Sequence, residues 1–221
     1  MELQAMFMRL NLIYLILAVV TSFAFAIVRG IRWKLIVSPQ KSIPVVRALT
    51  LYSAGQLLNS AMPALTGQVG RLILFARKES LRKTFVFGTM VLEVLFDAIS
   101  LIIFVFFASF VFPFPSQYRF IGFIIAGTTA LVMIGLYLIL HFQNHLEESG
   151  RRRLRDRWPG VYITIKKFIR SFTKGIELLK SSQHLFGSIF YSLIAWTVHM
   201  LAIYLLFRAF DLEVPFTGAA V

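Results

Sequence analysis

Cysteine is absent from the 221-residue sequence, and charged side chains are scarce. Without cysteine the chain has no disulfides, thiolate nucleophiles or Cys-ligated zinc or iron–sulfur centres. Charged residues make up 15% and hydrophobic residues 58% of the chain, whereas soluble domains average about 25% and about 45–50%. This apolar excess excludes soluble globular, disordered and fibrous proteins.

Familiar catalytic patterns are also missing. The chain has no phosphate-binding glycine loop, no nucleophile elbow and no zinc-protease helix motif. His141, His145 and Glu148 have a spacing that can ligate a metal, but a third ligand on the same face is lacking, so we predict no metal site. No catalytic residue and no cofactor are predicted, and the sequence favours a protein that is not an enzyme.

The remaining charge is strongly positive and predicts membrane partners. Lys and Arg total 23 against 10 Asp and Glu, a formal charge of +13. On an apolar chain such an excess is typical of cytoplasmic loops that contact anionic lipid, and it argues against nucleic acid.

Long uncharged or nearly uncharged segments predict the spans. A helix needs about 20 apolar residues to cross the hydrocarbon. We therefore predict an all-α, polytopic transmembrane bundle forming one integral membrane domain over residues 1–221. Its spans are expected at residues 10–28, 84–112, 120–140 and 185–207.

Residues 43–65 are apolar but contain glycine, proline and polar residues. Loops 29–47 and 66–83 on either side carry five basic residues each, and loop 142–184 carries ten. Basic loops are typically cytoplasmic, so both ends of 43–65 are expected on one side, in a multi-pass protein of the plasma membrane. A re-entrant broken helix fits this arrangement, and an ordinary span that violates the charge rule once is the alternative.

Residues 160–181 predict a cytoplasmic amphipathic helix. Apolar residues such as Val161, Ile165 and Phe172 fall on one face and lysines and Arg170 on the other, as in helices that lie on an anionic leaflet. The same charges, with the arginines of 151–157, equally serve to fix the topology.

Two acidic residues inside a span are the strongest functional signal. Glu93 and Asp97 are four apart and share one helix face, and charges at such depth are costly. Arg71, beside the glycines and proline of the re-entrant segment, is the nearest partner in sequence. An arginine there suits phosphate binding, and an ion pair that only fixes packing is the alternative.

The ordered set of motif residues resembles the lysylphosphatidylglycerol synthase transmembrane region, a flippase-like membrane family. The residues that carry the resemblance are Arg32, Trp33, Asn59, Pro63, Gly67, Arg71, Glu93 and Asp97. Val94 and the Ala64-Leu65-Thr66 stretch depart from the family pattern. The resemblance implies further segments before and after this chain, so the chain is expected to be incomplete at both ends.

The predicted function is binding and translocation of an anionic phospholipid or lipid-linked headgroup. Arg71 would exchange between the Glu93/Asp97 pair and the lipid phosphate, with Asn59, Gln68 and backbone N–H groups near Gly67 and Gly70 as further donors. Two alternatives remain open. The chain is a non-catalytic module that presents lipid to a transferase on another domain or chain, or an anchor that recruits partners through residues 151–180.

Overall fold

The computed structural model describes residues 10–62, 64–111, 120, 123–124, 126–138, 141–142, 159–177, 181–212 and 214. This part of the chain is all-α, which confirms the predicted fold class. Three helices are long and apolar enough to cross a membrane, and Ala126–Leu138 is a shorter apolar helix within the expected span 120–140. The labelled helices are α2 (Leu12–Val37), α3 (Val45–Ala61), α4 (Ala64–Lys78), α5 (Lys83–Val111), α7 (Pro159–Gly175) and α8 (Ser182–Ala209).

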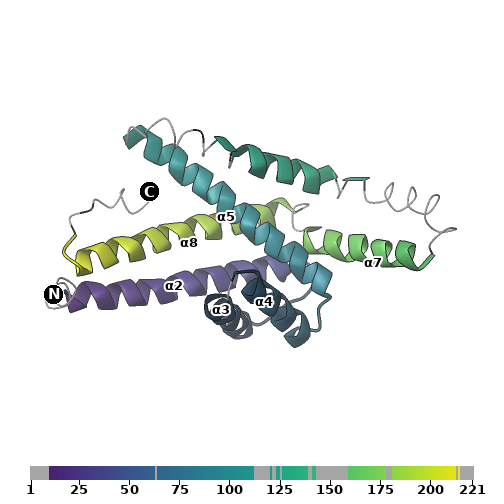
Figure 1. Cartoon of the computed structure of the whole chain (residues 1–221), viewed down its shortest axis with the longest axis horizontal. Coiled ribbons are helices and arrows are strands. Elements are labelled where there is room, and N and C mark those ends of the chain that lie inside the picture. Colours follow the sequence, from purple (N-terminus) through teal and green to yellow (C-terminus); the bar gives the residue numbers. More distant parts are fainter. Residues whose placement is uncertain are drawn as a thin grey trace.

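Helices α2 and α8 form an antiparallel pair along most of their lengths (Figure 1). The side chain of Asn11 caps the start of α2, and its backbone N–H donates to the carbonyl of Ala209, at the end of α8, at 2.9 Å. Further along, the ring of Phe25 stacks on His199 with ring centroids 4.8 Å apart. The outer face of α2 exposes apolar side chains such as Ile13 and Phe23, which suits contact with lipid chains.

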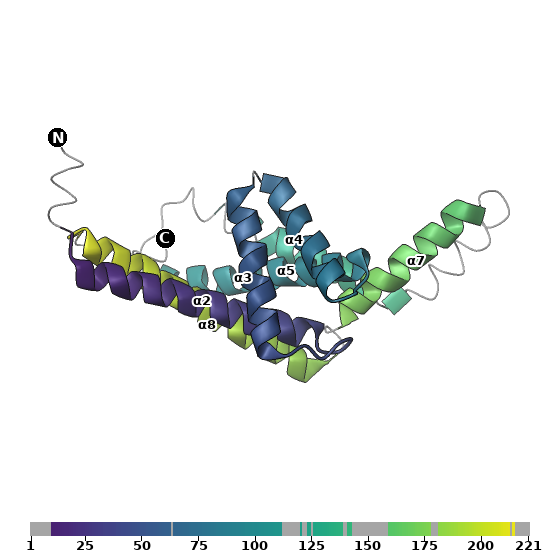
Figure 2. The same ribbon diagram turned by 90° about the horizontal axis from the view of Figure 1, so that it is seen from below.

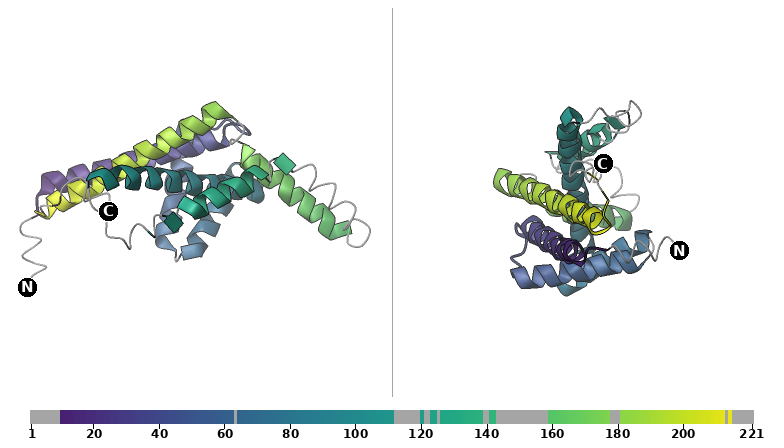
Figure 3. Two further views of the ribbon diagram at one scale, coloured as in Figure 1. Left: turned by 90° about the horizontal axis from the view of Figure 1, so that it is seen from above. Right: turned by 90° about the vertical axis from the view of Figure 1, so that its left-hand side faces the viewer.

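Helix α5 crosses the α2/α8 pair diagonally (Figure 1), and Figure 3 shows α2, α5 and α8 in two further views. Near its start α5 packs closely on α7. A Cβ atom on Gly175 would lie 2.4 Å from the carbonyl oxygen of Phe85, and one on Gly88 would lie 3.0 Å from that of Phe172. The two glycines therefore let the backbones of α5 and α7 touch.

The predicted broken helix is a hairpin made of α3 and α4. The helix breaks at Met62, whose backbone is extended, and α4 returns alongside α3 (Figure 2). Helices α3 and α4, with 17 and 15 residues, are each shorter than the about 20 residues that a helix typically uses to cross the hydrocarbon. The placement of this hairpin relative to a membrane, and the grouping of the chain into one membrane domain, stay predictions.

The expected loops 29–47 and 66–83 are largely helical. Residues through Val37 continue α2, and residues through Lys78 form α4. Within the segment 160–181, expected as an interfacial helix, α7 ends at Gly175, and its position at a membrane surface stays a prediction. The loop boundaries were wrong because basic residues were taken to end each helix, whereas several of them pair with acids inside the protein.

The open end of the hairpin is closed by Glu79, which is 2% exposed. Its carboxylate accepts from Nζ of Lys41 at 2.9 Å and from Nε of Arg47 at 2.5 Å. Lys41 also donates to the backbone carbonyl of Glu79, and Arg47 to that of Lys78, the last residue of α4. Burial opposes charging of Glu79, but the bonds from Lys41 and Arg47 outweigh it and hold the pKa of Glu79 below its usual value.

Candidate functional site

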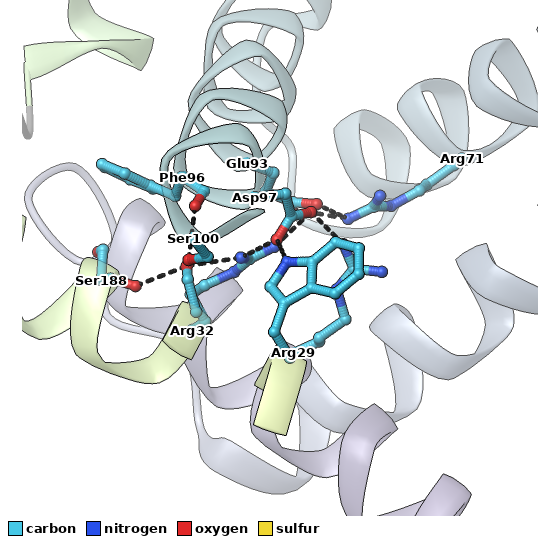
Figure 4. A network of polar contacts seen from close by, with 10 residues as sticks. Arg29, Arg32, Arg71, Glu93, Phe96, Asp97, Ser100 and Ser188 are labelled. Atoms are coloured by element: carbon cyan, nitrogen blue, oxygen red, sulfur yellow. Dashed lines mark hydrogen bonds and ion pairs between the residues drawn. The ribbon is translucent and has the colours of Figure 1, made fainter. Parts of the chain in front are cut away.

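Five charged residues meet where α2, α4 and α5 come together (Figure 4). We call this group the charge cluster. Helix α2 contributes two arginines, α4 one arginine and α5 two acids, and α8 adds polar side chains at the edge. The members of the charge cluster are Arg29, Arg32, Arg71, Glu93 and Asp97.

Arg71 and Glu93 form a buried ion pair between α4 and α5. One terminal nitrogen of Arg71, Nη2, donates to both carboxylate oxygens of Glu93, at 2.7 and 2.6 Å. The two residues are 5% and 3% exposed. The contact predicted between the hairpin arginine and the first acid of α5 is therefore present.

Aromatic rings and a glycine hold Arg71 in place. Its Cζ lies 4.7 Å from the ring centroid of Tyr52 and 5.0 Å from that of Phe75, distances at which a cation is attracted to a ring face. A Cβ on Gly55 would lie 2.8 Å from Cγ of Arg71. Gly55 thus leaves room on α3 for the stem of the arginine.

Asp97 does not pair with Arg71, which corrects the expectation that one cation serves both acids. It binds Arg29 and Arg32 of α2, the latter at 2.5 Å. It also accepts from the indole N–H of Trp196 on α8 at 3.3 Å. The expectation failed because Arg71 was chosen for its closeness in sequence, while α2, far away in the chain, runs past Asp97.

Arg32 is fully buried, with no exposed surface. Its Nη1 donates to Asp97 and, at 2.7 Å, to the hydroxyl of Ser192 on α8. Ser192 in turn donates to the backbone carbonyl of Ser188 at 2.8 Å (Figure 4). Asp97 and Arg32 therefore tie α2, α5 and α8 together.

The charge cluster carries more positive than negative charge. Three arginines face two carboxylates, which leaves a formal charge of +1. The Nε–H groups of Arg29, Arg32 and Arg71 are buried and have no acceptor in the described part of the chain. Uncompensated buried charge and unpaired donors are costly, so the arrangement favours an additional anion with several acceptor oxygens.

The other predicted headgroup residues lie near the hairpin tip. Asn59 is half-buried and Gln68 is exposed. Gly67 packs against α3, since a Cβ there would lie 2.6 Å from Cα of Asn59. Gly70 lies inside α4, where backbone N–H groups bond within the helix. Gly67 therefore packs against α3 and Gly70 lies within the helix, and the predicted role of backbone N–H groups near them in headgroup binding stays a prediction.

Three residues of the site were missed by sequence reasoning as partners of the acids. Arg29 and Arg32 were assigned to a cytoplasmic loop, although their spacing of three places them on one face if the helix continues. Trp196 lies 99 residues beyond Asp97 in the chain, and nothing in its surroundings in sequence points to Asp97.

The possible metal ligands are only partly described. His141 is exposed and stacks on Tyr137 with ring centroids 5.9 Å apart, while His145 and Glu148 lie outside the described residues. Among the described residues, no group of three His, Asp or Glu side chains is placed to hold a metal ion.

Long apolar helices, a broken hairpin and a buried ionic centre between them define an integral membrane protein with a charged interior. A family model described as the lysylphosphatidylglycerol synthase TM region matches residues 1–221, and the chain belongs to this family. Its membrane location and its relation to lipid modification or translocation follow from that membership. No curated protein and no solved structure matches the chain.

Proposed function

We propose that the charge cluster binds the phosphate of an anionic phospholipid or lipid-linked headgroup, and that the protein carries this headgroup across the plasma membrane. The observation that carries the proposal is the buried Arg71, in a cluster with excess positive charge. Within the described part of the chain it has one acidic partner, and its Nε–H has no acceptor. Guanidinium groups bind phosphate through paired, charge-assisted hydrogen bonds.

The proposed exchange takes place at Arg71 and Glu93, with Asp97 outside it. Asp97 accepts from three side chains on two helices, whereas Glu93 is held by Arg71 from the hairpin. A phosphate that takes Arg71 would thus break one contact between α4 and α5 and leave the α2/α5/α8 contacts intact. Gln68, exposed on α4, and Asn59 remain candidate donors to the rest of the headgroup.

The test is lipid transfer in reconstituted vesicles. We expect Arg71→Gln to abolish movement of fluorescent phosphatidylglycerol between leaflets, because the phosphate loses its cation. Arg71→Lys keeps the charge without the planar fork and should retain a small part of the rate. The matched control is Arg77→Gln, which removes an exposed arginine from the same helix and should transfer normally.

Circular dichroism and thermal unfolding of each variant separate loss of function from loss of fold. A folded Arg71→Gln protein that transfers lipid at the native rate would contradict the proposal. If Arg71→Gln does not fold, the lipid transfer rate of Arg71→Lys tests the proposal. A wild-type rate for this variant would also contradict it.

A second function is favoured by the family description, which names the membrane region of a synthase. In that case the protein binds lipid at the same charge cluster and presents it to a transferase on another domain or chain. Native mass spectrometry would then show phosphatidylglycerol bound to the wild type and lost from Arg71→Gln, while vesicles containing the wild type show no transfer above protein-free vesicles.

The orientation belongs to the proposal as well. Residues 142–184, with ten basic and four acidic residues, are proposed to face the cytoplasm, because basic loops are retained on that side. Protease digestion of right-side-out and inverted vesicles tests this, since cleavage in 142–158 is expected only when the cytoplasmic face is outside.

A further inference from the structure

Tyr52 on α3 carries a hydroxyl with no hydrogen-bond partner among the described residues. The residue is 1% exposed, and its Oη has no hydrogen bond within the described chain. Buried polar groups are nearly always paired, and an unpaired one costs free energy. The position needs an aromatic ring beneath Arg71, which a phenylalanine would supply, so packing accounts for the ring but not for the hydroxyl.

The ring that carries this hydroxyl packs on Arg71, which also has a donor without an acceptor among the described residues. The ring of Tyr52 is 4.7 Å from Cζ of Arg71, and the Nε–H of Arg71 also has no acceptor among the described residues. Arg71 uses its Nη2 for Glu93. Arg71 and the tyrosine ring packed against it therefore each carry a buried donor that has no acceptor in the described part of the chain.

A phosphate group matches this arrangement better than a second carboxylate. It presents several acceptor oxygens in a tetrahedral arrangement, so separate oxygens can accept from a guanidinium and from a neighbouring hydroxyl. The charge cluster has a formal charge of +1, which one phosphodiester monoanion neutralises.

We infer that the Tyr52 hydroxyl and the Arg71 Nε–H together bind the oxygens of the ligand phosphate, which makes Tyr52 a specificity-determining residue of the site. The inference rests on the proposed function and adds a donor from α3 to the arginine from α4. The bound phosphate would link the two arms of the hairpin. The shared chemistry is a phosphate monoanion, supplied either by a lipid headgroup or by free phosphate.

The test compares Tyr52→Phe with Tyr14→Phe in detergent-solubilised full-length protein. Both remove one hydroxyl and keep a ring, but Tyr14 is 38% exposed on α2. Thermal unfolding is followed while short-chain phosphatidylglycerol is titrated in one arm and inorganic phosphate in the other. Without ligand, Tyr52→Phe should melt at or above the wild-type temperature, because the Tyr52 hydroxyl bonds to none of the residues that the structure describes.

With ligand, Tyr52→Phe should bind roughly tenfold more weakly, the loss expected for one hydrogen bond to a charged group, and Tyr14→Phe should bind as the wild type does. Weakening in the lipid arm alone identifies a lipid headgroup, and equal weakening in both arms identifies phosphate itself. Unchanged binding by Tyr52→Phe in both arms overturns the inference. A lower melting temperature without ligand also overturns it, because the hydroxyl would then have a structural partner.

Arg71→Gln measured alongside distinguishes the two proposals. Loss of binding in Arg71→Gln with unchanged binding in Tyr52→Phe overturns the role of Tyr52 and leaves the proposed function standing. Unchanged binding in both variants overturns both.

Discussion

Arg71 and Glu93 are each more than nine-tenths buried, and each compensates the charge of the other. Removal of one charge from such a pair leaves the second uncompensated, which typically costs about 3–5 kcal/mol. If a ligand anion replaces Glu93 at Arg71, removal of the Glu93 charge should destabilise the free protein and also strengthen ligand binding. The two effects can be measured on one variant.

We predict that Glu93→Gln lowers the melting temperature of the ligand-free protein and tightens binding of phosphatidylglycerol about tenfold. Arg71 loses its anion in the free state, and the lipid phosphate no longer competes with a carboxylate for it. Thermal unfolding with and without lipid measures both effects. Glu177→Gln, at the α7 end and bonded to Gln40, is the control and should change neither. Weaker lipid binding by Glu93→Gln would mean that the carboxylate assists the ligand and does not compete with it.

At the scale of elements, the hairpin depends on close approach of α3 and α4 near its tip. A methyl group on Gly67 would collide with the backbone of Asn59 at 2.6 Å, whereas one on Gly70 would meet Sδ of Met62 at an ordinary 3.7 Å. The same substitution at two neighbouring glycines of one helix therefore has different consequences.

We predict that Gly67→Ala separates the arms of the hairpin and lowers the unfolding free energy by about 1–3 kcal/mol, as overpacking of a well-packed contact does. Gly70→Ala should be neutral or slightly stabilising, because alanine favours a helix over glycine by about 1 kcal/mol. Denaturant unfolding of both variants in the same detergent tests the contrast. Equal effects at the two positions would show that the arms do not touch at Gly67.

The base of the hairpin predicts a dependence on pH. Because the pKa of Glu79 is lowered in the folded protein relative to the ordinary 4.5, the charged form stabilises the fold. That stabilisation is complete above the ordinary value and is lost as the pH falls below 4.5 toward the lowered value. Protonated Glu79, which follows α4, no longer holds Lys41 of the α2–α3 connection and Arg47 of α3.

We therefore expect wild-type protein to lose more stability than Glu79→Gln between neutral pH and pH values below 4.5. Near neutral pH Glu79→Gln should be the less stable of the two, and at low pH their melting temperatures should converge. Melting curves over this range, at constant ionic strength, measure the difference. If the melting temperatures of the two proteins changed with pH by equal amounts, Lys41 and Arg47 would not stabilise the charged form of Glu79.

At the scale of the whole molecule, the sequence predicts the helices well and the ends of the helices poorly. Apolar length identified α5 and α8 closely, and the proline and glycines near Met62 predicted the break between α3 and α4. The charge rule then assigned Arg29, Arg32 and Arg71 to loops, because it counts cations without regard to partners. All three are members of the charge cluster. Without Arg29 and Arg32, the basic residues that support a cytoplasmic location of segment 29–47 are Lys34, Lys41 and Arg47.

Half of the ionic centre could also be predicted from the sequence. The i, i+4 spacing of Glu93 and Asp97 required a cation, and the arginine of the hairpin is present beside Glu93. The partner of Asp97 could not be predicted, because it depends on how α2 and α8 pack against α5. Ion pairs between distant segments depend on tertiary structure, and the spacing of residues within one helix does not predict them.

Asp97 joins α2, α5 and α8, so its substitution should weaken the contacts among all three helices. We predict that Asp97→Asn lowers the unfolding free energy by about 3 kcal/mol, because it leaves Arg29 and Arg32 without their anion. Arg29→Gln in the same protein removes one of the two stranded cations. The double variant should therefore be more stable than Asp97→Asn alone, although less stable than the wild type.

A double-mutant cycle of Arg29→Gln and Asp97→Asn, read by denaturant unfolding in detergent, gives the coupling directly. We expect about 1–3 kcal/mol of coupling, the range for residues that share one ionic network. The same cycle between Arg71→Gln and Asp97→Asn should give a much smaller value, because Arg71 binds Glu93 and not Asp97. Strong coupling of Asp97 to Arg71, with none to Arg29, would mean that one cation serves both acids and that the α2 arginines lie apart from them.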